Sequence, residues 1–138
     1  MFRPNILYLH CHDAGRYIQP YGHAVQTPHL QALAQEGVLF RQAFCAAPTC
    51  SPSRAALLTG QAPHTAGMLG LAHPPMNWRL HDYSQHLNYT LMAAGYTTVR
   101  AGEQHLLAAS TGTDVGATLG YREELPLTVR QEEGIGHA

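Results

Sequence analysis

Short apolar runs alternate with amphipathic stretches along this chain of 138 residues. The run Asn5–His10 (NILYLH) is mostly apolar and is followed by a polar stretch that contains glycine. Such a run predicts a strand that is buried on both faces, as the strands of parallel sheets are. The segment Val38–Phe44 places alternate side chains on opposite sides of an extended chain, which predicts either a short strand or an extended connection.

Two amphipathic stretches begin with a polar cap residue followed by proline, which is a typical helix start. The first, Thr27–Gly37, predicts a helix that ends at its glycine and places Leu30 and Leu33 on a face that we expect to enter the core. The second, Ser51–Gly60, predicts a helix of about two turns with Ser51 as its cap. Cys50 is therefore expected just ahead of a helix N-terminus.

The rest of the chain predicts one long connection, a third helix, a second strand and a loose tail. The segment Gln61–Asp82 is rich in Pro, Gly and His without clear periodicity, which indicates a long surface connection whose His73 is expected to be solvated but could contact a substrate. Ser84–Gly95 predicts a helix capped by its serine, and Tyr96–Arg100 is rich in β-branched and aromatic residues, as strands are. Arg130–Ala138 shows no packing pattern.

Strands that alternate with helices predict an α/β fold with a mainly parallel sheet flanked by helices. The length suits one compact domain, so we expect residues 1–138 to form a single one, in which residues 108–138 have no assigned structure and the tail is loosely ordered. In such sheets ligands bind beyond the carboxyl ends of the strands. The polar residues that follow the predicted strands are therefore the first candidates for a functional site.

Composition and charge exclude several classes of partner. With 8 basic and 9 acidic residues and no basic run, the chain is not expected to bind nucleic acid. It has no signal peptide pattern and no apolar stretch near the roughly 20 residues that span a bilayer, so we expect a cytoplasmic protein without membrane contact. The odd set of three cysteines favours thiol chemistry over a disulfide framework, with Cys11 and Cys45 expected as buried free thiols.

Three segments that are distant in sequence carry the candidate chemistry: His10–Asp13, Cys50–Arg54 and Gln104–His105. Each follows a predicted strand or begins a predicted helix, so all three could meet at one edge of the sheet. The positive end of a helix dipole and the guanidinium of Arg54, four residues after Cys50, would favour a bound anion such as sulfate or phosphate. The same environment would lower the pKa of a cysteine thiol and make it nucleophilic.

The segment Cys50–Gly60 (CSPSRAALLTG) matches the sulfatase signature throughout. Its core, Cys-x-Pro-Ser-Arg, is the sequence recognised for the conversion of cysteine to formylglycine. Arg3–Leu7, Thr27–Leu30 and Leu39–Phe44 also resemble family positions. The chain thus resembles the amino-terminal part of a sulfatase over about residues 3–107. Within that family its sequence is most similar to the sulfamidase branch, whose members remove N-linked sulfate from glucosamine.

The resemblance implies an alkaline-phosphatase-like fold and hydrolysis of sulfuric esters or sulfamates, on sulfated sugars or aryl sulfates. Cys50 would be the formylglycine precursor, converted by the formylglycine-generating enzyme. Arg54 would steady the formylglycine, and His105 would hydrogen-bond its gem-diol. A divalent metal, calcium in the family, would be held by His12, Asp13 and the modified Cys50.

The sequence departs from the family pattern at two of these positions. His12 stands where the family has the first of two aspartates, and an imidazole in place of a carboxylate weakens a calcium site and suits a softer divalent metal. Glu103 stands where the family has a lysine, two residues before His105, and reverses the local charge. Sulfatases also continue far beyond this length and supply further metal ligands and basic residues from that later part.

Two alternatives to an active sulfatase follow from the same residues. One is a truncated, non-catalytic fragment that lacks the later metal ligands, and an open edge of its parallel sheet would lead to self-association. The other is a cysteine-based phosphatase, whose loop places five residues between cysteine and arginine. Only three residues separate Cys50 from Arg54, so the spacing argues against the phosphatase.

Overall fold

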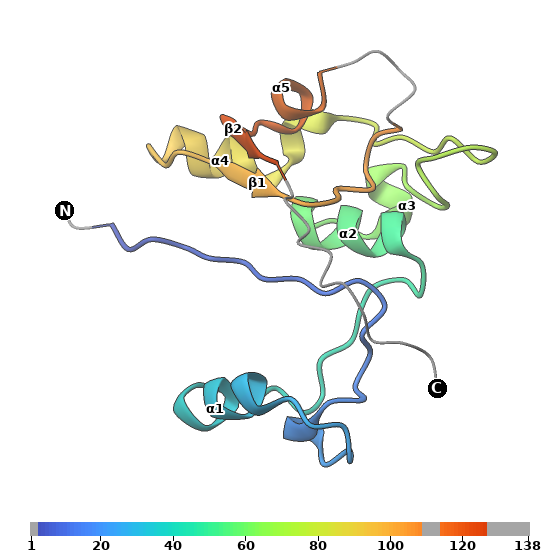
Figure 1. The fold of residues 1–138 in the computed structure, drawn as a ribbon. Helices are drawn as coiled ribbons and strands as arrows, with labels where there is room; N and C mark the ends of the chain where they lie inside the picture. Colours follow the sequence, from blue (N-terminus) through green and yellow to red (C-terminus); the bar gives the residue numbers. More distant parts are fainter. Residues whose placement is uncertain (1–2, 109–113, 127–138) are drawn as a thin grey trace. The chain divides into compact units, whose positions relative to one another are not determined.

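The computed structural model describes residues 3–108 and 114–126, and Figure 1 shows their path. The chain divides into two compact units, unit 1 (Met1–Phe44) and unit 2 (Cys45–Ala138), and each is described by itself. The expectation of a single domain over residues 1–138 stays a prediction. The predicted loose tail Arg130–Ala138 lies outside the described residues.

Unit 1 is built around helix α1 (Pro28–Glu36) and the 3-10 helix η1 (Gln19–Tyr21). The predicted helix is confirmed, with proline in its first turn and Gly37 donating its backbone N–H to the Leu33 carbonyl. Thr27 precedes the helix without capping it by its side chain. Its hydroxyl instead accepts a 3.1 Å hydrogen bond from the Gln19 N–H, and the Gln19 side-chain oxygen accepts from the Thr27 N–H at 3.2 Å. This reciprocal pair ties α1 to η1.

The predicted strand Asn5–His10 does not form, and Val38–Phe44 is an irregular connection with a turn at Arg41–Gln42 rather than a strand or an extended segment. Leu7 and Leu9 are 81% and 78% exposed. A strand needs a neighbour to complete its backbone hydrogen bonds, and unit 1 has no strand among its described residues. The expected apolar face of α1 is likewise outside the core, because Leu30 and Leu33 are exposed.

Unit 2 begins with helix α2 (Cys50–Thr59), which starts two residues earlier than predicted. Its N-cap is Thr49, whereas the predicted cap Ser51 lies within the first turn and is fully buried. The helix ends as predicted at Gly60, whose positive φ of 68° is the left-handed conformation that glycine adopts without strain. Helix α3 (Pro63–Ala66) follows within the segment predicted to be a surface connection.

The next elements are the 3-10 helix η2 (Tyr83–Gln85) and helix α4 (Leu87–Ala93). Ser84 lies inside η2 rather than capping the third helix, because the Asp82 carboxylate accepts from the Ser84 N–H at 2.8 Å. The cap of α4 is His86, whose Nδ1 accepts from the Asn88 N–H at 3.2 Å. The predicted helix is therefore present, and its cap lies two residues later than expected.

The sheet consists of strands β1 (Val99–Ala101) and β2 (Glu123–Leu125), which run parallel with Val99 opposite Glu123. Helix α5 (Val115–Leu119) lies between them in sequence, so the three elements form a strand–helix–strand unit (Figure 1). An ion pair of 2.7 Å between the cross-strand partners Arg100 and Glu124 supports the register. The predicted α/β fold with a parallel sheet flanked by helices is confirmed, although neither α5 nor β2 was predicted.

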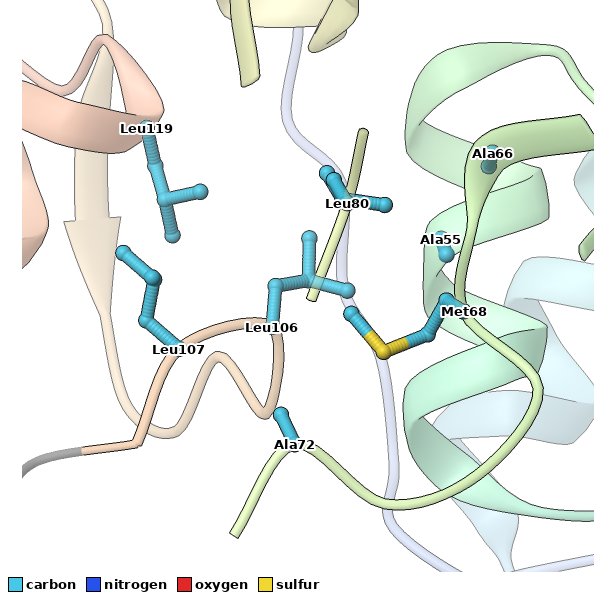
Figure 2. Packing of buried hydrophobic residues seen from close by; sticks show 8 residues of the cluster. All are labelled: Ala55, Ala66, Met68, Ala72, Leu80, Leu106, Leu107 and Leu119. Carbon is cyan, nitrogen blue, oxygen red and sulfur yellow. The ribbon is translucent and has the colours of Figure 1, made fainter. Parts of the chain in front are cut away.

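The core of unit 2 gathers side chains from α2, from the segment after it and from the loop after β1 (Figure 2). Met68 and Leu80, which lie in the predicted surface connection Gln61–Asp82, are 0% and 5% exposed. Burial of each such side chain stabilises a fold by about 1.5–3 kcal/mol. The connection is therefore a structural part of the core. Of the helices in the described ranges, none has both the length and the apolar character needed to cross a bilayer.

Candidate active site

Cys50 occupies the first position of α2, with its side chain partly exposed and its thiol free. The Thr49 side chain makes no capping hydrogen bond to the helix. The first N–H groups of a helix point along its axis beyond the N-terminus and favour an anion there. Ser51 and Pro52 are fully buried, so the start of α2 is fixed in the core while Cys50 itself is partly exposed.

Arg54 lies one helical turn after Cys50 and therefore on the same face of α2. Its Nη1 donates a 3.0 Å hydrogen bond to the backbone carbonyl of Glu103, which ties the helix to the loop after β1. Its Nε is buried and has no hydrogen-bond partner among the described residues. A fixed guanidinium with an unsatisfied donor is suited to bind an anion beside Cys50.

His105 follows β1, as predicted, and reaches Cys50. One of its ring nitrogens lies within 4.8 Å of the Cys50 sulfur. Its backbone has a positive φ of 56°, which is uncommon for a residue other than glycine. The flanking residues hold this conformation, because Gln104 bonds the backbone of Leu107 and Leu106 is fully buried.

The long connection contributes a second histidine that the sequence left as an expected solvated residue. The rings of His73 and His105 meet edge to face, with centroids 6.4 Å apart. The neighbouring Ala72 donates its N–H to the Ser51 hydroxyl at 3.0 Å. Neither contact has a local sequence signal, because each joins residues more than 20 positions apart.

The other predicted site residues, His12 and Asp13, belong to unit 1. His12 Nδ1 and Asp13 Oδ2 lie 3.0 Å apart, and the Asp13 side chain is 85% exposed. Asp13 also has a positive φ of 54°. Cys11 and Cys45 are exposed, so the prediction that they are buried was wrong. Both remain free thiols, as expected.

The donors beside Cys50 in unit 2 do not make a calcium site. The potential ligands that unit 2 supplies are the Cys50 sulfur and a ring nitrogen of His105, and softer divalent metals prefer both. Calcium takes about six to eight oxygen ligands. In the described part of the chain, no group of three or more potential ligands includes a carboxylate. The side chains of unit 2 therefore do not by themselves account for a calcium ion.

Comparison with known proteins identifies the family of the chain. A sequence model of the Sulfatase family matches residues 4–126. The chain belongs to the sulfatase family. The resemblance predicted from Cys50–Gly60 is thereby confirmed, and so is the alkaline-phosphatase-like fold class. Sulfatases generally use formylglycine and a divalent metal.

Three relatives illustrate the breadth of the match. Human N-sulphoglucosamine sulphohydrolase is 41% identical over 103 residues, which are 74% of this chain and 20% of that protein. Delta 4,5-hexuronate-2-O-sulfatase of Bacteroides thetaiotaomicron is 30% identical over 127 residues, 91% of this chain and 25% of that protein. Arylsulfatase A of Bos taurus is 34% identical over 134 residues, 95% of this chain and 26% of that protein. The chain thus spans 20% to 26% of the length of these sulfatases.

Proposed function

We propose that this chain carries the nucleophile of a sulfatase that hydrolyses sulfate esters or sulfamates of sugars, or aryl sulfates. The observation that supports this most strongly is the grouping of Cys50, Arg54 and His105 in unit 2. A nucleophile precursor at a helix N-terminus, a guanidinium one turn later and an imidazole within 4.8 Å of the sulfur suit attack on an anionic group.

Each of the three residues has a distinct role in the proposed reaction. Formylglycine, made from Cys50 by the formylglycine-generating enzyme, supplies two geminal hydroxyls when hydrated. One attacks sulfur and displaces the alcohol or amine, which leaves with the proton of that hydroxyl as its bond to sulfur breaks. The other hydroxyl then loses its proton and restores the aldehyde, and sulfate leaves as its bond to the formylglycine carbon breaks. The N-terminus of α2 and the Arg54 guanidinium would bind the sulfate oxygens and stabilise the charge that grows on them. His105 would orient the hydroxyls by a hydrogen bond and hold the proton that one of them loses.

The resemblance also assigns a divalent metal to His12, Asp13 and the modified Cys50. Calcium is the ion of the family pattern, and His12 makes a softer ion compatible with this set. Asp13 would supply the hard oxygen donor of this set, which is the kind of ligand that calcium prefers. No step of the proposed reaction depends on which ion is bound.

The proposed function is tested by mass spectrometry of the protein from its native source, together with turnover of 4-nitrophenyl sulfate and of N-sulfoglucosamine. We expect the Cys50 peptide to have the mass of formylglycine and the protein to hydrolyse at least one of the two substrates. An intact thiol in a cell that has the maturation enzyme would contradict the proposal. Formylglycine without turnover would favour the non-catalytic fragment.

Glu103 is expected to lower activity, because its carboxylate repels a sulfate bound beside Arg54. Its backbone carbonyl accepts from the Arg54 guanidinium, so its side chain begins at the edge of the site. Glu103→Lys restores the lysine of the family pattern and should raise kcat/KM for a sulfate ester by roughly tenfold or more. Glu103→Gln should give a smaller rise in kcat/KM. Glu36→Lys, which makes the same charge change in an exposed part of unit 1, is the control. Lower activity in Glu103→Lys would contradict this prediction.

A further inference from the structure

His73 belongs to a segment that the sequence describes as a loop, yet its ring contacts that of His105, a neighbour of the proposed nucleophile. Its ring meets the His105 ring edge to face, with the two planes at 83°. His105 in turn lies within 4.8 Å of the Cys50 sulfur. The side chain of His73 is exposed, so a molecule that occupies the site can reach it.

The backbone of His73 is held on both sides. On one side, Ala72 donates its N–H to the Ser51 hydroxyl at 3.0 Å, and both residues are buried. On the other side, the His73 carbonyl accepts a 3.2 Å hydrogen bond from the Asn77 N–H. Ser51 directly follows Cys50, so one hydrogen bond couples the position of His73 to that of the nucleophile. Such preorganisation is typical of residues that bind a ligand.

The ring of His73 is also oriented. Its Nδ1 lies 3.1 Å from the backbone carbonyl of Pro74. A carbonyl oxygen only accepts, so Nδ1 carries the hydrogen of this bond. In a neutral imidazole with that tautomer, Nε2 is a hydrogen-bond acceptor. His73 therefore presents an acceptor next to a site whose other side chains are suited to bind an anion.

We propose that His73 contacts the leaving group of the substrate and selects saccharides, by accepting at Nε2 a hydrogen bond from a sugar hydroxyl or a sulfamate N–H. Sulfate oxygens only accept hydrogen bonds, so they cannot satisfy this atom. A simple aryl leaving group also lacks a donor, whereas a sugar carries several. The inference rests on the proposed function and adds to it the residue that would distinguish sugar sulfates from aryl sulfates.

Two substitutions separate this role from a structural one. In His73→Gln an amide oxygen can reach the place of Nε2, whereas in His73→Asn the amide reaches only the place of Nδ1. We expect His73→Asn to lower the ratio of kcat/KM for N-sulfoglucosamine to kcat/KM for 4-nitrophenyl sulfate by about tenfold to a hundredfold. His73→Gln should restore most of that ratio. An unchanged ratio in His73→Asn, or an equal loss in both variants, would overturn the proposal.

A binding measurement decides the role of His73 even if the protein turns over neither substrate. Nitrogen-15 NMR of the histidine rings, recorded on protein with an unconverted Cys50 thiol, reports the tautomer of His73 and any hydrogen bond to Nε2. We expect the Nε2 resonance of His73 to shift with N-sulfoglucosamine and not with inorganic sulfate, while that of the exposed His64 stays unchanged. A shift with inorganic sulfate alone, or no shift with the sugar, would exclude the proposed contact. Loss of turnover with the shift retained would count against the proposed function only.

Discussion

Arg54→Ala is expected to lower kcat/KM for a sulfate ester by about two to three orders of magnitude, the usual loss when a fixed donor to transition-state charge is removed. The guanidinium lies on the face of α2 that carries Cys50, and its buried Nε has no partner among the described residues. The change removes a positive charge and the planar set of donors together. Steady-state kinetics on the matured protein measures the loss.

The second function of Arg54 calls for a conservative variant. Its Nη1 also holds the Glu103 carbonyl at 3.0 Å, so the alanine variant frees the loop that positions His105. Arg54→Lys keeps the charge but not the planar geometry, and should recover only part of the activity. Arg122→Ala, the same truncation at an exposed position, serves as the control. Near wild-type turnover in Arg54→Ala, with formylglycine present, would show that Arg54 does not act at the site.

The parts of the fold that could be predicted have strong local signals. The proline and glycine near the ends of helices α1 and α2 placed both ends of α1 and the end of α2 correctly, and the start of α2 to within two residues. These signals act through backbone geometry, which neighbouring residues decide. The cap of α4 has no such local signal. Histidine is not a usual cap residue, and His86 takes that role as a buried side chain.

Burial was harder to predict, because it depends on partners that are distant in sequence. The run Asn5–His10 has the composition of a central strand, yet it forms no strand and is exposed, because composition alone does not provide a neighbouring strand. Conversely, Met68 and Leu80 lie among prolines, glycines and histidines without periodicity, and both are core residues. Periodicity reports which face of an element is apolar, and a segment without a regular element has no face to report.

The candidate site shows the same division between local and distant information. Cys50 and Arg54 are one helical turn apart, so their shared face followed from spacing. His105 was placed correctly because it follows a strand, although β1 itself begins three residues later than predicted. The contacts of Ser51 and His73 could not be inferred, because Ser51 bonds Ala72, the neighbour of His73, across a separation of 21 residues. Tertiary contacts of this kind decide which members of a loop reach a site.

Acidification is expected to destabilise the fold through His86. The ring is fully buried, and burial lowers its pKa from 6.5 to about 4. The unfolded chain therefore binds a proton below about pH 6.5 that the folded chain does not bind until about pH 4. The free energy of unfolding is therefore unaffected by this group above about pH 6.5 and decreases as the pH falls from 6.5 to about 4. The total decrease over this range is about 3 kcal/mol.

His86→Asn tests this prediction because asparagine can supply an acceptor at the place of Nδ1 and so retain the cap of α4, yet it does not titrate. We expect the variant to be less stable than the wild type at neutral pH, since a smaller side chain leaves a cavity. Its free energy of unfolding, measured by denaturant titration between pH 4 and pH 7, should however fall less steeply with acid than that of the wild type. His64→Asn, at an exposed histidine of α3, should keep the wild-type slope. Equal slopes in all three proteins would show that His86 is not the group that couples protonation to unfolding.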